Sequence, residues 1–374
     1  MTDQIGIEIY PDELRNWLEA GRAVEVIDIR PSAEYSAWKI PGARNIDVYW
    51  AIHANDPGAL ADYQAQAGIP VVLVCFSGQT SLVAARYLRG RGVPAISLAG
   101  GMSRWSLAWN TAEVPLEASS ASVIQVRRTG KGCLSYIIGS DGQALVIDPS
   151  VEPGVYQHLA ADRQWQITQV LDTHIHADHL SRSRQLAGAT GAEHMLPRQE
   201  RASFVYRGVG DGDVVPVGKA QLAVLGTPGH TPESISLVLD GQALFTGDTL
   251  FLESVGRPDL MADLPETSQR AHALYQTLGR LRKLDPRLIV LPCHASQPVA
   301  FNGQPLARPL GDVLKSARAL ELDEPAFVDW ILNRLPPTPP HFEAIVGLNE
   351  AGEFPPFNPV RLEAGANFCA MPGD

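Results

Sequence analysis

A series of histidine and aspartate residues between positions 174 and 294 constrains the fold of this chain more than any other feature. Four short motifs supply its seven members, which are His174, His176, Asp178, His179, His230, Asp248 and His294. A lone histidine is most often an ordinary packed side chain, but imidazoles and carboxylates gathered in this order are the donors of a metal site. We therefore expect a metal centre whose ligands lie on loops over a rigid sheet.

The sequence around these residues predicts how each side chain is aimed. His174 and His176 are two residues apart, so an extended backbone turns both imidazoles to one face. Asp178 and His179 follow directly, at the point where we expect the strand to become a helix. His230 stands in a Pro-Gly turn and Asp248 ends the apolar run 243–245, so both arrive from the ends of strands.

These motifs resemble the metallo-β-lactamase superfamily, in which an H-x-H-x-D-H loop is followed by a later His, Asp and His. The resemblance implies an αββα sandwich, with the metals at the edge between its two sheets. We place this domain at residues 122–300 and expect residues 301–374 to form a C-terminal extension packed on it.

Composition agrees with two soluble domains. The chain has 374 residues, of which 45% are hydrophobic, enough for two sizeable cores. A net charge of −11 without a Lys/Arg run argues against nucleic acid as a partner. Residues 1–4 lack the start of a secretion signal and no apolar run could span a bilayer, so we expect a cytoplasmic protein with no membrane partner. The four cysteines, Cys75, Cys133, Cys293 and Cys369, form no paired framework and are expected as thiols.

The first third of the chain is organised around Cys75. Residues 24–28 and 71–74 read as buried strands and residues 82–89 as a helix, a pattern typical of an α/β domain with a parallel sheet. Cys75 falls in the turn between strand and helix, where backbone N–H groups and the helix dipole favour a thiolate or a persulfide. A small buried thiol that merely packs is the alternative. The predicted cradle is Phe76, Ser77, Gly78, Gln79, Thr80 and Ser81.

The surroundings of Cys75 resemble a rhodanese domain. The motifs that carry the resemblance are Asp28-Ile29-Arg30, Ile40-Pro41-Gly42-Ala43, the Cys75 loop, and Leu98 to Met102 with Trp105. It implies that Cys75 is catalytic and relays sulfane sulfur. We place this α/β domain at residues 1–112, and the polar, small residues that follow predict a linker at 113–121.

Ligand counting leaves the metal open. Seven donors could hold two zinc ions with a bridging hydroxide, an arrangement for hydrolysing a thioester or a lactam. His174, His230 and Asp248 alone make a two-His, one-carboxylate set, which leaves open positions on a ferrous ion for a thiol substrate and O₂.

A later motif favours iron. The Gly-Arg-x-Asp sequence at 256–259 resembles persulfide dioxygenases, whereas the related glyoxalase II hydrolases carry aromatic residues after Gly-Arg. That resemblance implies one Fe(II) per chain, held at the positions of His174, His230 and Asp248. Four residues then orient the ligands or hold a second metal: His176, Asp178, His179 and His294. Arg257 and Asp259 are predicted as catalytic residues that position the substrate, the alternative being a surface ion pair.

The two resemblances together predict a bifunctional enzyme of sulfur metabolism. It would oxidise a low-molecular-weight thiol persulfide with O₂ to sulfite and thiol, with Cys75 passing sulfur to or from sulfite or a thiol acceptor. Ala295 and Ser296 follow His294 where glutathione-using members have Asp-Tyr, which leaves the carrier thiol open. The alternative is a glyoxalase-II-like hydrolase with two zinc ions and a rhodanese module for docking or sensing. We also expect a homo-oligomer.

Overall fold

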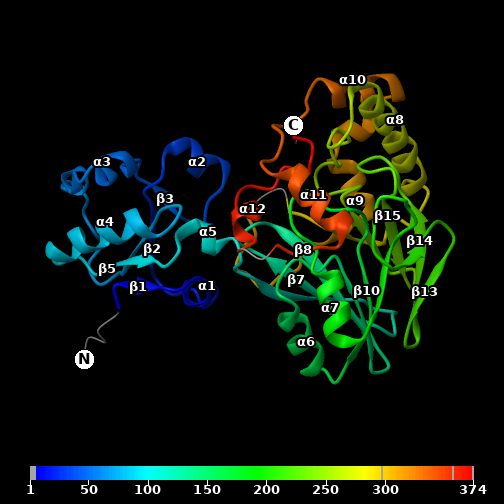
Figure 1. Cartoon of the computed structure of the whole chain (residues 1–374), viewed down its shortest axis with the longest axis horizontal. Helices are drawn as coiled ribbons and strands as arrows, with labels where there is room; N and C mark the ends of the chain where they lie inside the picture. The colour runs from blue at the N-terminus through cyan, green and yellow to red at the C-terminus, as the bar shows by residue number, and fades with distance from the viewer. Residues whose placement is uncertain (1–5, 296–297, 356–357, 373–374) are drawn as a thin grey trace.

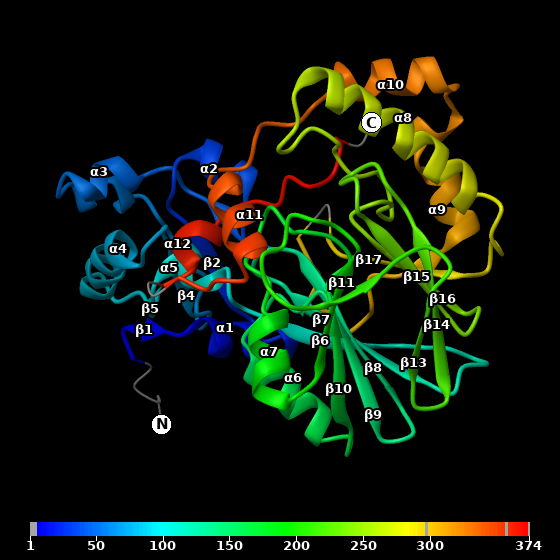
Figure 2. The same cartoon turned by 45° about the vertical axis from the view of Figure 1, so that its right-hand side comes forward.

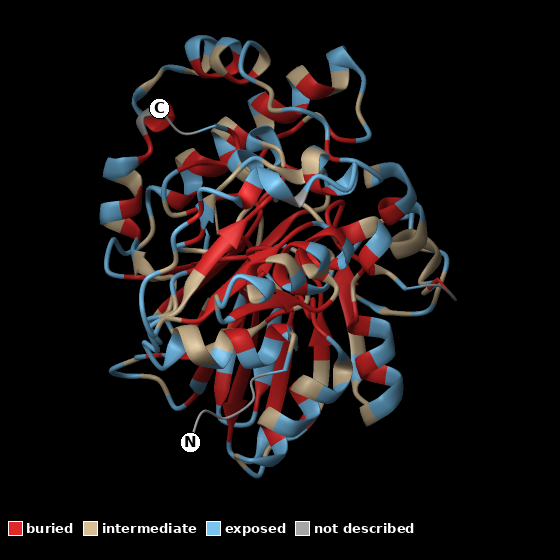
Figure 3. Cartoon of the chain, turned by 90° about the vertical axis from the view of Figure 1, so that its left-hand side faces the viewer, coloured by how far each residue is buried: buried red, intermediate tan, exposed pale blue. Residues whose placement is uncertain are grey.

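The computed structural model describes residues 6–295, 298–355 and 358–372. Residues 1–4 and Ser296, on which two of the expectations above rest, lie outside the described residues. The N-terminal α/β domain and the larger C-terminal domain lie at opposite ends of the long axis of the molecule (Figure 1). Buried residues follow the strands of both domains, while the outer faces of the helices are exposed (Figure 3).

The N-terminal domain is built on a parallel five-stranded sheet, as predicted. Its order is β1-β5-β4-β2-β3, with bounds β1 (Glu8–Ile9), β2 (Glu25–Asp28), β3 (Arg44–Asn45), β4 (Val71–Val74) and β5 (Ala95–Leu98). Alternate residues feed the two faces: Val26 joins one hydrophobic cluster and Ile27 the other. All four residues of β4 are buried, because helices cover both faces. These helices are α1 (Pro11–Glu19), α2 (Ser32–Ala37), α3 (Tyr49–His53), α4 (Gln79–Gly90) and α5 (Gly101–Trp105).

The larger domain is a sandwich of two sheets. The first has the order β12-β11-β10-β9-β8-β7-β6 and the second β13-β14-β15-β16-β17-β18. Bounds in the first sheet are β6 (Asn110–Val114), β7 (Ser122–Arg128), β8 (Cys133–Ser140), β9 (Gln143–Ile147), β10 (Gln166–Leu171), β11 (Glu193–Pro197) and β12 (Arg207–Val209). Bounds in the second are β13 (Val214–Val217), β14 (Ala220–Gly226), β15 (Ile235–Leu239), β16 (Ala243–Gly247), β17 (Ile289–Pro292) and β18 (Arg308–Pro309).

Helices cover both outer faces of this sandwich. In β8, Tyr136 and Ile138 enter the core between the sheets, and Ile137 packs outward under the first pair of helices. That pair is α6 (Pro153–Ala161) and α7 (Ser183–Thr190). The second sheet is covered by α8 (Leu264–Leu281), α9 (Leu310–Ser316) and α10 (Glu324–Leu332). The layers stand apart in Figure 2, so the predicted αββα sandwich is confirmed.

The predicted linker is wrong for its first residues. Residues 110–114 form β6, which pairs antiparallel with β7 at the edge of the first sheet, so the expected boundary at 112 falls inside a strand. Ala112 and Val114 are buried while Glu113 is exposed, a period of two that is hard to see among small and polar residues.

The two domains are packed together: Trp38 Nε1 donates to Gly130 O at 2.8 Å and Arg128 Nε to Ser106 O at 2.7 Å.

The C-terminal extension packs on the sandwich and reaches the first domain. Helix α9 ends because the backbone becomes extended at Ala317, and a 3-10 turn, η2 (Arg318–Glu321), follows it. Then α10 packs on α8, and α11 (Phe342–Ala351) and α12 (Val360–Glu363) follow. Helix α12 contacts α5 and lies between the two domains (Figure 1). Among the described residues, no helix is both long and apolar enough to span a bilayer.

Candidate functional site

The loop between β10 and α7 carries the first four donors. Helix α7 begins only at Ser183, so the predicted change from strand to helix at Asp178 and His179 is wrong, and both residues lie in the loop. The C-terminal extension holds this loop in place: Asn349 Nδ2 donates to the carbonyl oxygens of His176 and His179 at 2.8 and 3.0 Å. The loop conformation therefore depends on a helix more than 160 residues further along the chain.

Three predicted ligands converge at the edge of the two sheets. The donor atoms of His174, His230 and Asp248 lie within 4.8 Å of one another, and all three residues are buried. Asp248 Oδ2 is 3.6 Å from both His174 Nε2 and His230 Nε2. Neither Asp248 Oδ2 nor His174 Nε2 has a hydrogen-bond partner. Buried polar atoms without partners are costly, so this set fits a metal ion.

In both histidine ligands a hydrogen bond fixes the ring nitrogen Nδ1, which is the one that does not face Asp248. His230 Nδ1 donates to Arg257 O at 2.7 Å, and His174 Nδ1 lies 3.0 Å from Thr173 Oγ1, which itself donates to Asp148 Oδ2 at 2.9 Å. These bonds place the ring protons on Nδ1 and leave the Nε2 lone pairs for a metal.

Protonation states suit the same role. Burial lowers the pKa of both His174 and His230, so both rings are neutral near neutral pH. Burial acts to raise the pKa of Asp248, but the charge and hydrogen bond of His294 outweigh it and lower that pKa. Two neutral imidazoles and one carboxylate are the forms that bind a metal.

His176 does not join this group of three. Its Nε2 lies 3.2 Å from Asp148 Oδ1, and its nearest donor group is Asp148 with Cys293. Asp148 also accepts from the backbone N–H of Thr173 at 2.7 Å. His176 thus contacts Asp148 through Nε2, while its Nδ1 is buried without a hydrogen-bond partner, and its role behind the ligands stays a prediction.

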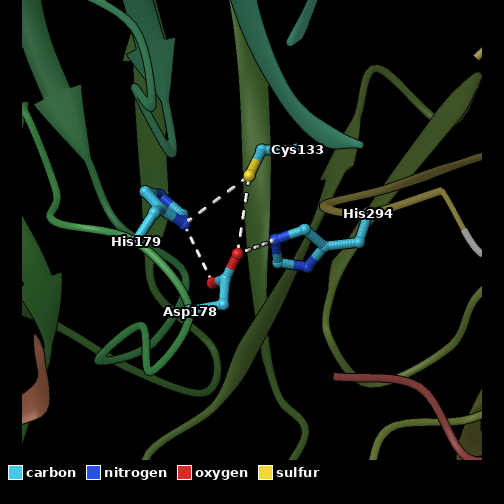
Figure 4. Close-up of side chains that lie close together, drawn as sticks. All are labelled: Cys133, Asp178, His179 and His294. Carbon is cyan, nitrogen blue, oxygen red and sulfur yellow. Dashed lines mark hydrogen bonds and ion pairs between the residues drawn. The ribbon is translucent and has the colours of Figure 1, made fainter. Parts of the chain in front are cut away.

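A second group of four donors, one of which is Cys133, gathers around Asp178 (Figure 4). Asp178 is its centre: Oδ1 is 2.9 Å from His179 Nδ1, and Oδ2 is 3.0 Å from His294 Nε2 and 3.5 Å from Cys133 Sγ. His294 Nδ1 donates to Asp248 Oδ1 at 2.6 Å, which links this group to the first. The four residues are Cys133, Asp178, His179 and His294.

Charges in this second group stabilise one another. Burial acts to lower the pKa of His179, but the charge of Asp178 and then that of Cys133 raise it to about 10. Burial and Asp178 act to raise the pKa of Cys133, and the charge and hydrogen bond of His179 outweigh them and lower it to about 6. The four residues are thus linked by ion pairs, while the buried Nε2 of His179 has no hydrogen-bond partner.

Arg257 and Asp259 form a buried ion pair, not a surface one. Nε and Nη2 of Arg257 donate to the two oxygens of Asp259, each at 2.7 Å. The remaining donors reach the backbone carbonyls of Pro336, Pro337 and Phe368. A guanidinium has five N–H donors, and all five are used within the protein. The pair thus anchors the C-terminal extension, and a role of Arg257 and Asp259 in positioning the substrate stays a prediction.

The Cys75 loop has the expected form. Cys75 Sγ accepts from the backbone N–H groups of Gly78 at 3.2 Å and Ser81 at 3.3 Å, and lies 3.3 Å from Ser81 Oγ. Gly78 has φ 84, and a Cβ there would lie 2.7 Å from Gly100 N, so only glycine fits. Helix α4 begins at Gln79, so the predicted loop residues Gln79, Thr80 and Ser81 form its first turn, while Phe76 and Ser77 are exposed.

Sequence reasoning missed several residues that shape the site. Asp148 stands at the end of β9 with φ 51, and its position after a strand was the available signal. Cys133 gave no signal, because only the bridge that pairs it with His294 brings it to the site. Glu363 bonds the metal loop from the C-terminal tail: its Oε1 accepts from Leu180 N at 2.9 Å, and its Oε2 from Arg128 at 2.8 Å.

Fold and site together define an αββα domain with metal-binding groups, joined to an α/β domain with a cysteine loop. Residues 128–294 match the metallo-beta-lactamase superfamily, and residues 10–108 match the rhodanese-like domain. A hydroxyacylglutathione hydrolase of Rhodospirillum rubrum is 35% identical over 49% of this chain and 68% of its own length. The chain belongs to the metallo-β-lactamase superfamily and carries a rhodanese-like domain in front of that fold.

Other similar proteins cover different shares of the chain. A hydroxyacylglutathione hydrolase of Polaromonas is 39% identical over 41% of this chain, which spans only 57% of that relative. The crystal structure of ETHE1 from Myxococcus xanthus is 28% identical with a TM-score of 0.53, and the match covers 66% of this chain and 100% of that one. Both likenesses show shared ancestry of the sandwich domain, and neither shows the reaction of this chain.

Proposed function

We propose that this chain is a persulfide dioxygenase with one Fe(II) per chain, fused to a sulfurtransferase domain that works through Cys75. The net reaction would be R–S–SH + O₂ + H₂O giving R–SH and sulfite. One observation carries the proposal: His174, His230 and Asp248 form a group of three donors that closes without His176, whose Nε2 is bonded to Asp148. Two imidazoles and one carboxylate are typical of ferrous oxygenases.

The chain's own residues would hold and orient the metal. His174 and His230 would bind through Nε2 and Asp248 through Oδ2, and the ion would supply one-electron chemistry that lets O₂ react with sulfur. His294 keeps Asp248 in place through its Nδ1, and Asp178 in turn faces His294 Nε2. All these residues are buried.

One sequence motif and one structural likeness support an oxidative reaction. The Gly-Arg-x-Asp motif resembles persulfide dioxygenases, and in the structure its Arg257 supplies the carbonyl that orients His230. The likeness to ETHE1 extends over the whole of that protein at 28% identity, while the matches to the hydrolases of Polaromonas and Rhodospirillum rubrum cover 57% and 68% of their lengths.

A hydroxyacylglutathione hydrolase is the second candidate. Two relatives with that name support it, because they are 39% and 35% identical to this chain over the regions that match. The structure also offers a place for a second ion in the group around Asp178, which would give the two metals that hydrolysis of a thioester uses.

One parallel assay separates the two. Wild-type protein is given glutathione persulfide or a hydroxyacylglutathione thioester, and O₂ uptake, sulfite and free thiol are measured. The proposal expects O₂ uptake with one sulfite per O₂ from the persulfide and no release of thiol from the thioester. Thioester hydrolysis without O₂ uptake would establish the hydrolase instead. Asp248→Asn should lose whichever activity is present.

A further inference from the structure

A cavity of about 480 Å³ lies between the two domains. The rhodanese-like domain contributes Arg30, Trp38 and Phe76 to its wall, the sandwich domain Lys131 and Asp178, and the C-terminal extension Phe368. Its volume is in the range of small-molecule sites. Phe76, which follows Cys75, and Asp178, which faces His294, both lie on its wall, while Cys75 and the three predicted ligands do not.

The cavity touches the immediate neighbour of the cysteine on one side. Phe76 follows Cys75 directly, and its side chain is 46% exposed. Cys75 Sγ itself is buried, but a persulfide places a second sulfur about 2 Å beyond it. The backbone N–H groups of Gly78 and Ser81 hold the inner sulfur, so the outer one is the group left to project from the loop.

On the other side the cavity touches the metal-binding groups. Asp178 lines the wall, with Oδ2 at 3.0 Å from His294 Nε2, and His294 bonds the predicted ligand Asp248 at 2.6 Å. The wall is thus separated from the group of three donors by one imidazole.

The walls indicate the chemistry of an occupant. Trp38 and Phe368 supply aromatic surface, and Lys131 supplies a buried cation, whose Nζ donates to Glu363 O at 2.8 Å and lies 4.0 Å from Asp178 Oδ2. An ammonium has three donors, so Lys131 can bond an anionic group of a ligand as well. A small organic thiol with a carboxylate, or its persulfide anion, matches this lining.

We propose that this cavity binds one low-molecular-weight thiol, which takes sulfane sulfur from Cys75 and presents it to the metal centre without leaving the protein. The proposal rests on the proposed function and names the route of its substrate. The carrier thiolate attacks the outer sulfur of the Cys75 persulfide, a new S–S bond forms to the carrier, the S–S bond to Cys75 breaks, and Cys75 leaves as a thiolate. No oxidant is needed, because one persulfide replaces another. An external sulfane-sulfur donor reloads Cys75.

Isotope dilution tests this route in the full chain. Cys75 is loaded with a heavy sulfur isotope, excess donor is removed, and glutathione and O₂ are added together with a large excess of unlabelled glutathione persulfide. If transfer occurs inside the cavity, the sulfite of the first turnover should contain at least about tenfold more heavy sulfur than full mixing with the unlabelled persulfide would give. The reason is that a confined carrier has a high effective concentration. Sulfite with the isotope ratio of the mixed pools would overturn the proposal.

A matched pair of variants locates the route. Ala37, the exposed last residue of α2, lines the cavity, so Ala37→Trp should fill it and remove the enrichment. Ala61 is equally exposed but lies outside the lining, so Ala61→Trp should keep the enrichment. If both variants keep it, the transfer does not use this cavity.

A binding readout keeps the two proposals apart. Trp38 and Trp50 line the cavity, so glutathione should quench tryptophan fluorescence of the wild type, and less so in Ala37→Trp and Trp50→Phe. Quenching without any O₂ uptake would refute the dioxygenase and leave the thiol site standing. O₂ uptake without quenching and without isotope enrichment would refute the shared cavity alone.

Discussion

His230 Nδ1 donates to the backbone carbonyl of Arg257 at 2.7 Å, and the guanidinium of the same Arg257 holds the C-terminal extension through Pro336, Pro337 and Phe368. One residue thus sets the orientation of a predicted ligand with its main chain and anchors the extension with its side chain. The extension is thereby part of the site.

Replacing Arg257 should destabilise the protein. Arg257→Ala leaves Asp259 and three carbonyls without their donor, and breaking a buried ion pair costs about 3–5 kcal/mol. Urea unfolding measures the loss in the free energy of unfolding. Asp259→Asn, which keeps a hydrogen-bond acceptor, should lose less. Wild-type stability of Arg257→Ala with loss of persulfide activity alone would contradict this structural role and support a substrate-positioning one.

His174 and His176 should differ in metal binding although they are two residues apart. His174→Ala removes an Nε2 that faces Asp248, so it should lose the metal, whereas His176→Ala removes a partner of Asp148 and should retain it. Metal analysis of both variants after the same dialysis checks this. Equal loss of metal in the two variants would favour a dinuclear site in which His176 is a ligand.

Cys75 should be the residue that carries sulfane sulfur. Cys75→Ser is expected to abolish sulfur transfer to sulfite or cyanide, because an oxygen cannot hold the outer sulfur, while O₂ uptake with preformed persulfide continues. Mass spectrometry of donor-treated wild type should find one extra sulfur on Cys75, which neighbours the cavity wall at Phe76. An extra sulfur on Cys133, Cys293 or Cys369 instead would contradict this assignment.

Glu363 should make stability depend on acid pH. Burial acts to raise the pKa of Glu363, but the charges of Arg128 and Arg182 outweigh it and lower that pKa from 4.5 to about 2. Because the pKa is lowered on folding, the stabilisation is complete above pH 4.5 and is lost as the pH falls through about 2. Glu363→Gln should therefore be less stable than wild type at pH 7, with a gap that narrows on acidification. A gap that stays constant down to acid pH would contradict the ion-pair role.

Local patterns predicted the strands and the ligand-bearing loops, because β4 and β9 are nearly continuous apolar runs that end at Cys75 and Asp148. They could not predict the edge strand β6, whose alternation is carried by alanine and valine alone. Nor could they reveal the partners of Asp178, since Cys133 and His294 reach it only through pairing between distant strands. The role of Arg257 was also out of reach, because its acceptors lie about 80 and 110 residues further along the chain.

The metal content of protein purified without O₂, measured by elemental analysis and followed by O₂ uptake with a thiol persulfide, tests the proposed iron site most directly. We expect one iron per chain at His174, His230 and Asp248, with O₂ uptake proportional to iron. Two tightly bound zinc ions per chain in a protein that hydrolyses thioesters and consumes no O₂ would contradict it.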